Sequence, residues 1–193
     1  MRELLAAIGD AWSAAGHDHL RGLIAGIAVP AAVKTGSGVP QHLMEDYADA
    51  LGALGVSHGL RDALQRIGGA LVWSEGSMKM PDSFRGRYAY VELAGPKGMI
   101  ASDDVSFGLY LQARDTIYPS HWHEAVEHYL VLSGTADWQM DDAQYVRRKP
   151  GEAFVHQSNQ RHATTTRDEP LLALWFWQGN ISDSTYRIVG VDA

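Results

Sequence analysis

The sequence predicts a mainly β protein in which an α-helical N-terminal region packs on a β-barrel, within one compact domain. Apolar residues recur at helical spacing through residues 1–70. Over residues 71–193, short runs rich in Val, Tyr, Phe and Trp alternate with Gly, Pro and Asp turns, as they do in strands. Many short strands with no helix between them are typical of a sandwich or a barrel.

Four helices are expected in the N-terminal region. Apolar stripes cover residues 3–14, 20–27, 41–54 and 58–71, and each predicts a helix face that packs into the core. Residues 29–40 are bounded by prolines and contain glycines, which predicts a loop. The histidines of this region are expected to be surface or capping residues: His17, His19, His42 and His58.

The strands are predicted from alternation and turn signals. We expect them at residues 72–76, 87–95, 106–113, 127–140, 144–149, 152–157, 162–166, 171–178 and 185–191. Because side chains alternate along a strand, Trp175 and Trp177 share one face, and Leu174 and Phe176 share the other. One face should line the barrel cavity, while the other should meet the helices or solvent.

Composition argues against several function classes. The chain has 193 residues, 46% of them apolar, a net charge of −7 and a pI near 5.6, so a folded domain that does not bind nucleic acid is expected. Because there is no cysteine, only N and O ligands could hold a metal. No apolar run approaches a membrane span, and Glu3 and Asp10 argue against a signal peptide. We expect a cytoplasmic protein with no membrane partner; a homodimer is left open.

Candidate metal ligands gather in residues 118–134, YPSHWHEAVEHYLVLSG. His121 and His123 are two residues apart, so both imidazoles would point to one face of an extended strand. Glu127 follows in the same stretch, and His162 lies downstream. Imidazoles with one carboxylate suit a divalent transition metal, and burying them without a metal or other bonds would be costly.

The spacing of these ligands resembles the two sequence motifs of the cupin superfamily, small β-barrels that hold one metal inside. The residues that carry the resemblance are His121, His123, Glu127, Gly134, Pro150, Gly151 and His162. It covers roughly residues 105–178 and implies the cupin double-stranded β-helix, a jelly-roll barrel, with the three histidines and the glutamate as metal ligands. One position departs from the pattern, because Asp115 stands where a glycine is usual.

Strand alternation also sorts the neighbours of the motif. Glu127 and Tyr129 share one face of their strand, whereas His128 faces the other side. We therefore expect Tyr129 to face the cavity with Glu127, and we expect His128 not to be a ligand of the cavity metal. His156 is a weaker pocket candidate than His162.

A narrower resemblance rests on Tyr129, two residues after Glu127, and on Tyr118, three residues before His121. With the chain length and the helical N-terminal region, these tyrosines make the sequence similar to the DddQ-like dimethylsulfoniopropionate lyases, which are cupins. The resemblance implies a metal-dependent carbon–sulfur lyase that splits this small zwitterion into dimethyl sulfide and acrylate by β-elimination. The cofactor would be one divalent transition metal ion, with zinc, iron(II) and manganese as the leading candidates.

On this hypothesis Tyr129 is the catalytic base, and Tyr118 has a catalytic or substrate-binding role. Trp122 and Trp177 would join Tyr118 in holding the sulfonium, with cation–π attraction worth roughly 0.5–2 kcal/mol per contact. His121 is either a metal ligand or a neighbour that bonds within the site. Another cupin enzyme (a dioxygenase or an isomerase) and a non-catalytic cupin that binds a small molecule remain as alternatives. Oxygen consumption would identify a dioxygenase.

Overall fold

The computed structural model describes residues 1–190 of the chain. The last residue of the strand expected at 185–191 and the predicted end of the barrel at residue 193 lie outside the described residues. The N-terminal part is helical: α1 (Arg2–Ala14), α2 (Asp18–Ala25), η1 (Gln41–Leu43), α3 (Met44–Gly52), α4 (His58–Ile67) and η2 (Gly68–Ala70). No described helix is long and apolar enough to cross a membrane.

The expected helices are present, and local signals explain their ends. The third divides into the 3-10 turn η1, which follows Pro40, and the α-helix α3. The fourth begins at His58 because the side chain of Ser57 accepts a hydrogen bond from the backbone N–H of Leu60 at 3.2 Å. It continues as the 3-10 turn η2 before the first strand.

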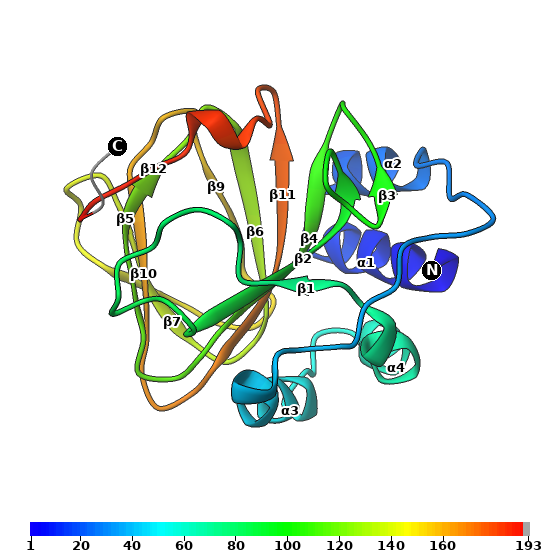
Figure 1. Ribbon diagram of the computed structural model, residues 1–193, viewed down its shortest axis with the longest axis horizontal. Helices are drawn as coiled ribbons and strands as arrows, with labels where there is room; N and C mark the ends of the chain where they lie inside the picture. Colours follow the sequence, from blue (N-terminus) through cyan, green and yellow to red (C-terminus); the bar gives the residue numbers. More distant parts are fainter. Residues whose placement is uncertain (191–193) are drawn as a thin grey trace.

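The rest of the described chain forms two sheets of mostly antiparallel strands. The strands are β1 (Trp73–Ser74), β2 (Tyr88–Gly95), β3 (Ile100–Ala101), β4 (Ser106–Gln112), β5 (Ile117–Trp122), β6 (Val126–Ser133), β7 (Ala136–Met140), β8 (Val146–Arg148), β9 (Ala153–His156), β10 (His162–Thr166), β11 (Leu171–Gln178) and β12 (Arg187–Ile188). One sheet has the order β1-β2-β4-β11-β6-β9, with β3 beside β2, and the other has the order β12-β5-β10-β7-β8. The two sheets enclose the barrel seen in Figure 1, and this is the predicted cupin double-stranded β-helix.

The strand expected at residues 185–191 is shorter than predicted. Only Arg187 and Ile188 pair with β5, and the 3-10 turn η3 (Asp183–Thr185) precedes them. Gly190, with φ 85°, lies in a turn directly after the strand. The short pairing nevertheless brings this segment against the edge of the barrel at β5.

The two faces of the larger sheet bury different side chains. On β11, Leu174 and Phe176 belong to a cluster shared with the helices, whereas Trp175 belongs to an aromatic cluster inside the barrel and Trp177 packs against it. The predicted alternation of this strand is therefore confirmed, and the barrel interior is the aromatic side.

The helices cover the outer face of the larger sheet. Figure 1 shows all four α-helices on one side of the barrel. Trp12 of α1 and Leu64 of α4 are fully buried in the same cluster as Leu109 of β4 and Leu132 of β6. Burial of these apolar faces attaches the helical layer to the strands that carry the interior residues on their other side.

Two turn positions hold the strand ends in place. Gly134, the last residue of the first cupin motif, has φ 73°, and a Cβ there would lie 1.9 Å from the carbonyl oxygen of Pro170. A larger residue would therefore clash with the chain entering β11. Asp115 has φ 49°, so the position where cupins usually carry glycine retains the left-handed backbone conformation.

Candidate metal centre and active site

A cavity of about 570 Å³ opens inside the barrel and contains most of the predicted site residues. Its lining includes Tyr118, His121, His123, Glu127, Tyr129 and Trp177. These side chains come from strands of both sheets and from the turn after β5. The three polar residues therefore meet at one place in the cavity, beside the aromatic cluster of the barrel interior.

Glu127 stands between two imidazoles. Its Oε2 lies 3.2 Å from Nε2 of His123 and 3.2 Å from Nε2 of His162. All three residues are at most 3% exposed. One ligand atom from each of these three residues lies within 4.8 Å of the other two, so the three residues could hold one metal ion.

Backbone carbonyls fix the orientation of each imidazole. Nδ1 of His121, His123 and His162 lies 2.9, 3.0 and 2.8 Å from the carbonyl oxygens of Pro119, Ala125 and Gln160. Because a carbonyl can only accept, each Nδ1 carries the proton and donates. In the neutral rings the lone pair therefore lies on Nε2.

This arrangement fits a bound cation. Nε2 of His162 faces the Glu127 carboxylate at 3.2 Å but makes no hydrogen bond within the described residues. Since Nδ1 already carries a proton, this contact requires either a second proton on the ring or a cation between the two groups. Burying such groups unpaired is costly. A divalent metal held by His123, Glu127 and His162 would satisfy all three, and N/O donor sets of this kind suit zinc, iron or manganese.

His121 lies beside this group. Its ring centroid is 4.0 Å from that of His162, and its side chain lines the cavity. Burial, and next the proximity of His162, hold the pKa of His121 well below its usual value, so the ring is neutral. It is available as a fourth ligand.

The charge of Glu127 is also maintained. Burial alone would raise the pKa of this carboxyl, but its contacts with His123 and His162 hold it well below its usual value. Trp177 donates from Nε1 to Glu127 Oε1 at 2.7 Å, which leaves Oε2 directed at the two histidines. The ring centroid of Trp177 also lies 4.2 Å from that of His123.

Tyr129 faces the cavity on the same side of β6 as Glu127, in agreement with the predicted alternation. It is 5% exposed. With the protein groups alone, burial and then the charge of Glu127 raise the pKa of Tyr129 well above its usual value. A tyrosinate at this position therefore requires positive charge nearby.

Tyr118 enters the cavity because β5 is irregular. Tyr118 and His121 are an odd number of residues apart, so a regular strand would direct them to opposite faces. The register of the pairing with β10 shifts by one residue between His162 and Thr164. As a result, Tyr118 and His121 both line the cavity. The Tyr118 ring stacks on the His121 ring, with ring centroids 3.9 Å apart, and the Tyr118 hydroxyl is hydrogen-bonded to that of Tyr186.

Trp122 lies apart from the other predicted site residues. It is absent from the described lining of the cavity, and the guanidinium of Arg161 sits 4.5 Å from its ring centroid. Its position next to His121 on β5 directs it to the other face of the strand. The indole therefore contacts a protein cation rather than the cavity.

Two further histidines flank the site. His128 faces away from the cavity as predicted, towards the helices, and its Nε2 contacts Gln178 Oε1 at 3.2 Å. His156 is fully buried and stacks on His162, with ring centroids 4.0 Å apart and planes 9° apart. It supports the His162 ring rather than lining the cavity.

Several aromatic residues that line the cavity were not predicted from the sequence: Tyr88, Tyr90, Tyr110 and Tyr186. Trp175 also lines it, on the strand face that the sequence left open between pocket wall and core. For Tyr88 and Tyr90 the signal was available, because they alternate with small or apolar residues on β2. Tyr186 belongs to the C-terminal segment and reaches the site only because that segment pairs with β5. Its ring centroid lies 5.4 Å from that of His121.

The chain is similar in sequence to known dimethylsulfoniopropionate lyases. The model of the dimethylsulfoniopropionate lyase family matches residues 34–173. The chain is 34% identical over 125 residues to dimethylsulfoniopropionate lyase DddQ of Ruegeria pomeroyi, covering 63% of this chain and 62% of the relative. It is also 34% identical over 132 residues to a Cereibacter sphaeroides DddL protein, provisionally named as such a lyase, covering 67% of this chain and 55% of the relative.

The fold comparison covers more of the molecule. The crystal structure of lyase DddQ from Ruegeria pomeroyi matches 97% of this chain and 98% of its own, with 26% identity and a TM-score of 0.68. The sequence match, in contrast, spans only 55% and 62% of the length of the two curated relatives. Because the family model matches well over half of the chain, this protein belongs to the dimethylsulfoniopropionate lyase family.

Proposed function

We propose that the protein is a metal-dependent lyase that cleaves dimethylsulfoniopropionate into dimethyl sulfide and acrylate. The observation that carries the proposal is the cavity itself, in which Tyr129 lies beside the buried His123–Glu127–His162 group. The family supports the substrate, and the residues support the chemistry.

The metal would be held by His123, Glu127 and His162, with His121 beside them. When bound, a divalent cation would supply positive charge that stabilises both the substrate carboxylate and the ionised form of Tyr129. The rest of the lining combines aromatic side chains with charged ones, among them Lys97 and Asp183.

Tyr129 would act as the general base. As a tyrosinate, its oxygen takes the proton from the carbon next to the substrate carboxylate. The electron pair left by that proton forms the C=C bond of acrylate, and the C–S bond breaks with its electrons on sulfur. Neutral dimethyl sulfide leaves, and Tyr129 returns its proton to solvent before the next turnover.

The aromatic wall would hold the sulfonium end. Tyr88, Tyr110 and Trp175 line the cavity together with Tyr118 and Trp177. Ring faces attract cations, with contacts worth roughly 0.5–2 kcal/mol each. The proposed role of Trp177 in substrate binding is retained, whereas Trp122 has no place in it because its ring lies outside the cavity.

The test is release of dimethyl sulfide into the headspace above metal-loaded protein and dimethylsulfoniopropionate, with a chelator-treated sample beside it. Metal-dependent release is expected. If no common divalent metal gives release, the lyase proposal is wrong, and oxygen uptake would then be the measurement for a dioxygenase.

A further inference from the structure

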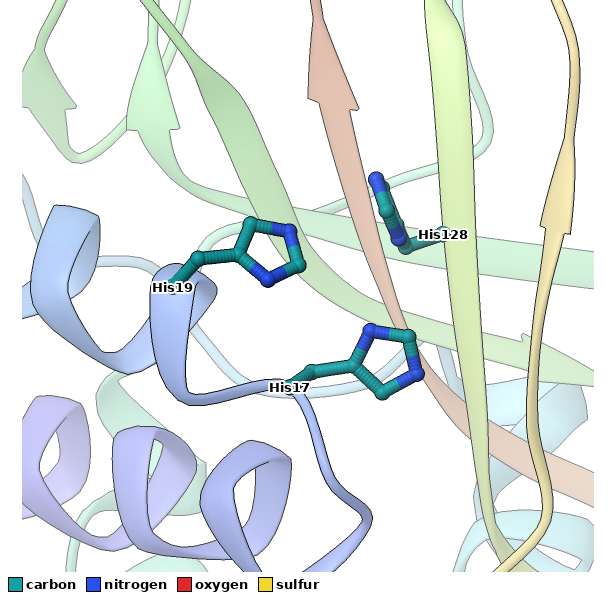
Figure 2. A group of neighbouring side chains, drawn as sticks. All are labelled: His17, His19 and His128. Carbon is teal, nitrogen blue, oxygen red and sulfur yellow. The ribbon is translucent and has the colours of Figure 1, made fainter.

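A second group of histidines lies on the opposite face of β6 from Glu127. It consists of His17, His19 and His128, whose potential ligand atoms all lie within 4.8 Å of one another. Figure 2 shows the three rings directed towards one another: His17 from the turn before α2, His19 from the first turn of α2 and His128 from β6. The ring centroids are 5.8 Å apart for His17 and His19, 5.6 Å for His17 and His128, and 5.5 Å for His19 and His128.

The group contains a buried nitrogen that lacks a partner. Nε2 of His128 contacts Gln178 Oε1 at 3.2 Å, whereas its Nδ1 is buried and has no hydrogen-bond partner among the described residues. Since the amide oxygen of Gln178 is an acceptor, Nε2 carries the proton and Nδ1 carries the lone pair. An outer hydrogen bond that fixes the tautomer in this way is typical of histidines that bind metals.

The other two histidines have no competing role in the helix. His17 occupies the N-cap position of α2, but its side chain makes no capping hydrogen bond. Its backbone N–H donates to the carbonyl of Trp12 at 2.9 Å, which holds the turn between α1 and α2. Burial, and next the proximity of His19, lower the pKa of His17, so its imidazole is neutral near pH 7.

We propose that His17, His19 and His128 form a second transition-metal site, separate from the cavity site, that links the helical layer to β6. Three imidazoles with no carboxylate suit zinc, copper or nickel rather than magnesium or calcium. The site is open on one side, because His19 is exposed while His128 is buried. An ion can therefore enter from solvent, and water can complete the coordination.

The metal would connect two separate parts of the chain. His17 is the N-cap of α2 and His19 lies in its first turn, while His128 lies between Glu127 and Tyr129 on β6. Binding to the folded state alone stabilises it by mass action. We therefore expect the ion to attach α2 more firmly to the strand whose other face carries the cavity residues.

The experiment counts bound zinc per chain in the purified full-length protein, by equilibrium dialysis and by calorimetric titration. His19→Ala removes one exposed imidazole from the second site. His162→Ala removes a cavity ligand, and the double variant removes one ligand from each site. His58→Ala is the matched control, because His58 is also an exposed histidine at the start of a helix, and its ring is hydrogen-bonded to Arg61.

Wild type and His58→Ala should each bind one zinc ion more per chain than His19→Ala. Zinc should also raise the Tm of His162→Ala more than it raises the Tm of the double variant. The proposal is wrong if His19→Ala binds as much zinc as wild type. If His162→Ala does not fold, the comparison of wild type with His19→Ala decides alone. Since no turnover is measured, failure here leaves the lyase proposal untouched.

Discussion

The carboxylate of Glu127 faces Nε2 of His162 at 3.2 Å, while Nδ1 of the same ring donates to the carbonyl of Gln160 at 2.8 Å. The carboxylate and Nε2 thus point at each other while the ring already carries a proton on its other nitrogen. A proton or a metal ion must lie between them for the arrangement to be stable. This relationship is the strongest structural argument for a metal in the cavity.

Removing one of these groups should remove the metal. His162→Ala is expected to lose the cavity metal and all measurable dimethyl sulfide release, because two protein ligands hold a divalent ion far more weakly than three or four. Metal analysis after dialysis and the headspace assay check both effects. His42→Ala, at an exposed residue paired with Glu75, is the control. Full turnover by a metal-free His162→Ala protein would show that the metal has no role.

Trp177→Phe separates the hydrogen bond of the indole from its aromatic face. The variant keeps a ring in the cavity but no longer donates to Glu127 Oε1. Loss of such an outer hydrogen bond typically weakens metal binding by roughly 10- to 100-fold. A competition titration with a metal chelator measures this. An unchanged affinity would mean that Trp177 does not position Glu127.

Tyr118→Phe tests the second predicted catalytic tyrosine. Its hydroxyl is hydrogen-bonded to that of Tyr186 and its ring stacks on His121. Phenylalanine retains the ring, so we expect turnover to fall but not to vanish, with a rise in KM. Steady-state kinetics of dimethyl sulfide release give both parameters. Complete loss of turnover at normal metal content would instead make Tyr118 the base.

Asp137 should give the fold a pH-dependent stability. The guanidinium of Arg147, and also that of Arg167, lower the pKa of Asp137, with distances of 2.9 Å and 2.8 Å to its carboxylate oxygens. A lowered folded-state pKa stabilises the protein above the unfolded pKa of about 3.9, and the effect is lost as pH falls through the folded value. Asp137→Asn should therefore lower Tm at pH 7 but much less near pH 3. A constant Tm difference across this range would contradict the assignment.

The sequence was informative wherever a residue's neighbours along one strand decide its environment. Alternation placed Glu127 and Tyr129 inside the barrel and His128 outside, and it predicted both faces of the strand containing Trp175. The motif spacing identified His123 and Glu127, which the fold brings together with His162. The face assignments depend on strand periodicity, whereas the ligand assignment depends on the resemblance to the cupin motifs.

Trp122 was expected to hold the substrate, but the same alternation that turns His121 into the cavity turns Trp122 away from it, towards Arg161. Other features depend on contacts between distant segments. The site role of Tyr186 follows from an edge pairing that only two residues make.

The histidines of the α2 region show the same limit. His17 and His19 were predicted to be surface or capping residues, since nothing near them in the sequence indicates that they lie close to His128. Only the packing of the helical layer on β6 brings the three rings together.

The most direct measurement compares wild type and Tyr129→Phe in the headspace assay at equal metal content. The substitution removes only the hydroxyl of a residue beside Glu127, so metal binding and fold should stay near wild type. We predict metal-dependent dimethyl sulfide release by the wild type and no measurable release by Tyr129→Phe, while Tyr145→Phe, at an exposed residue, remains active. Most of the wild-type rate in Tyr129→Phe would contradict the assignment of Tyr129 as the base.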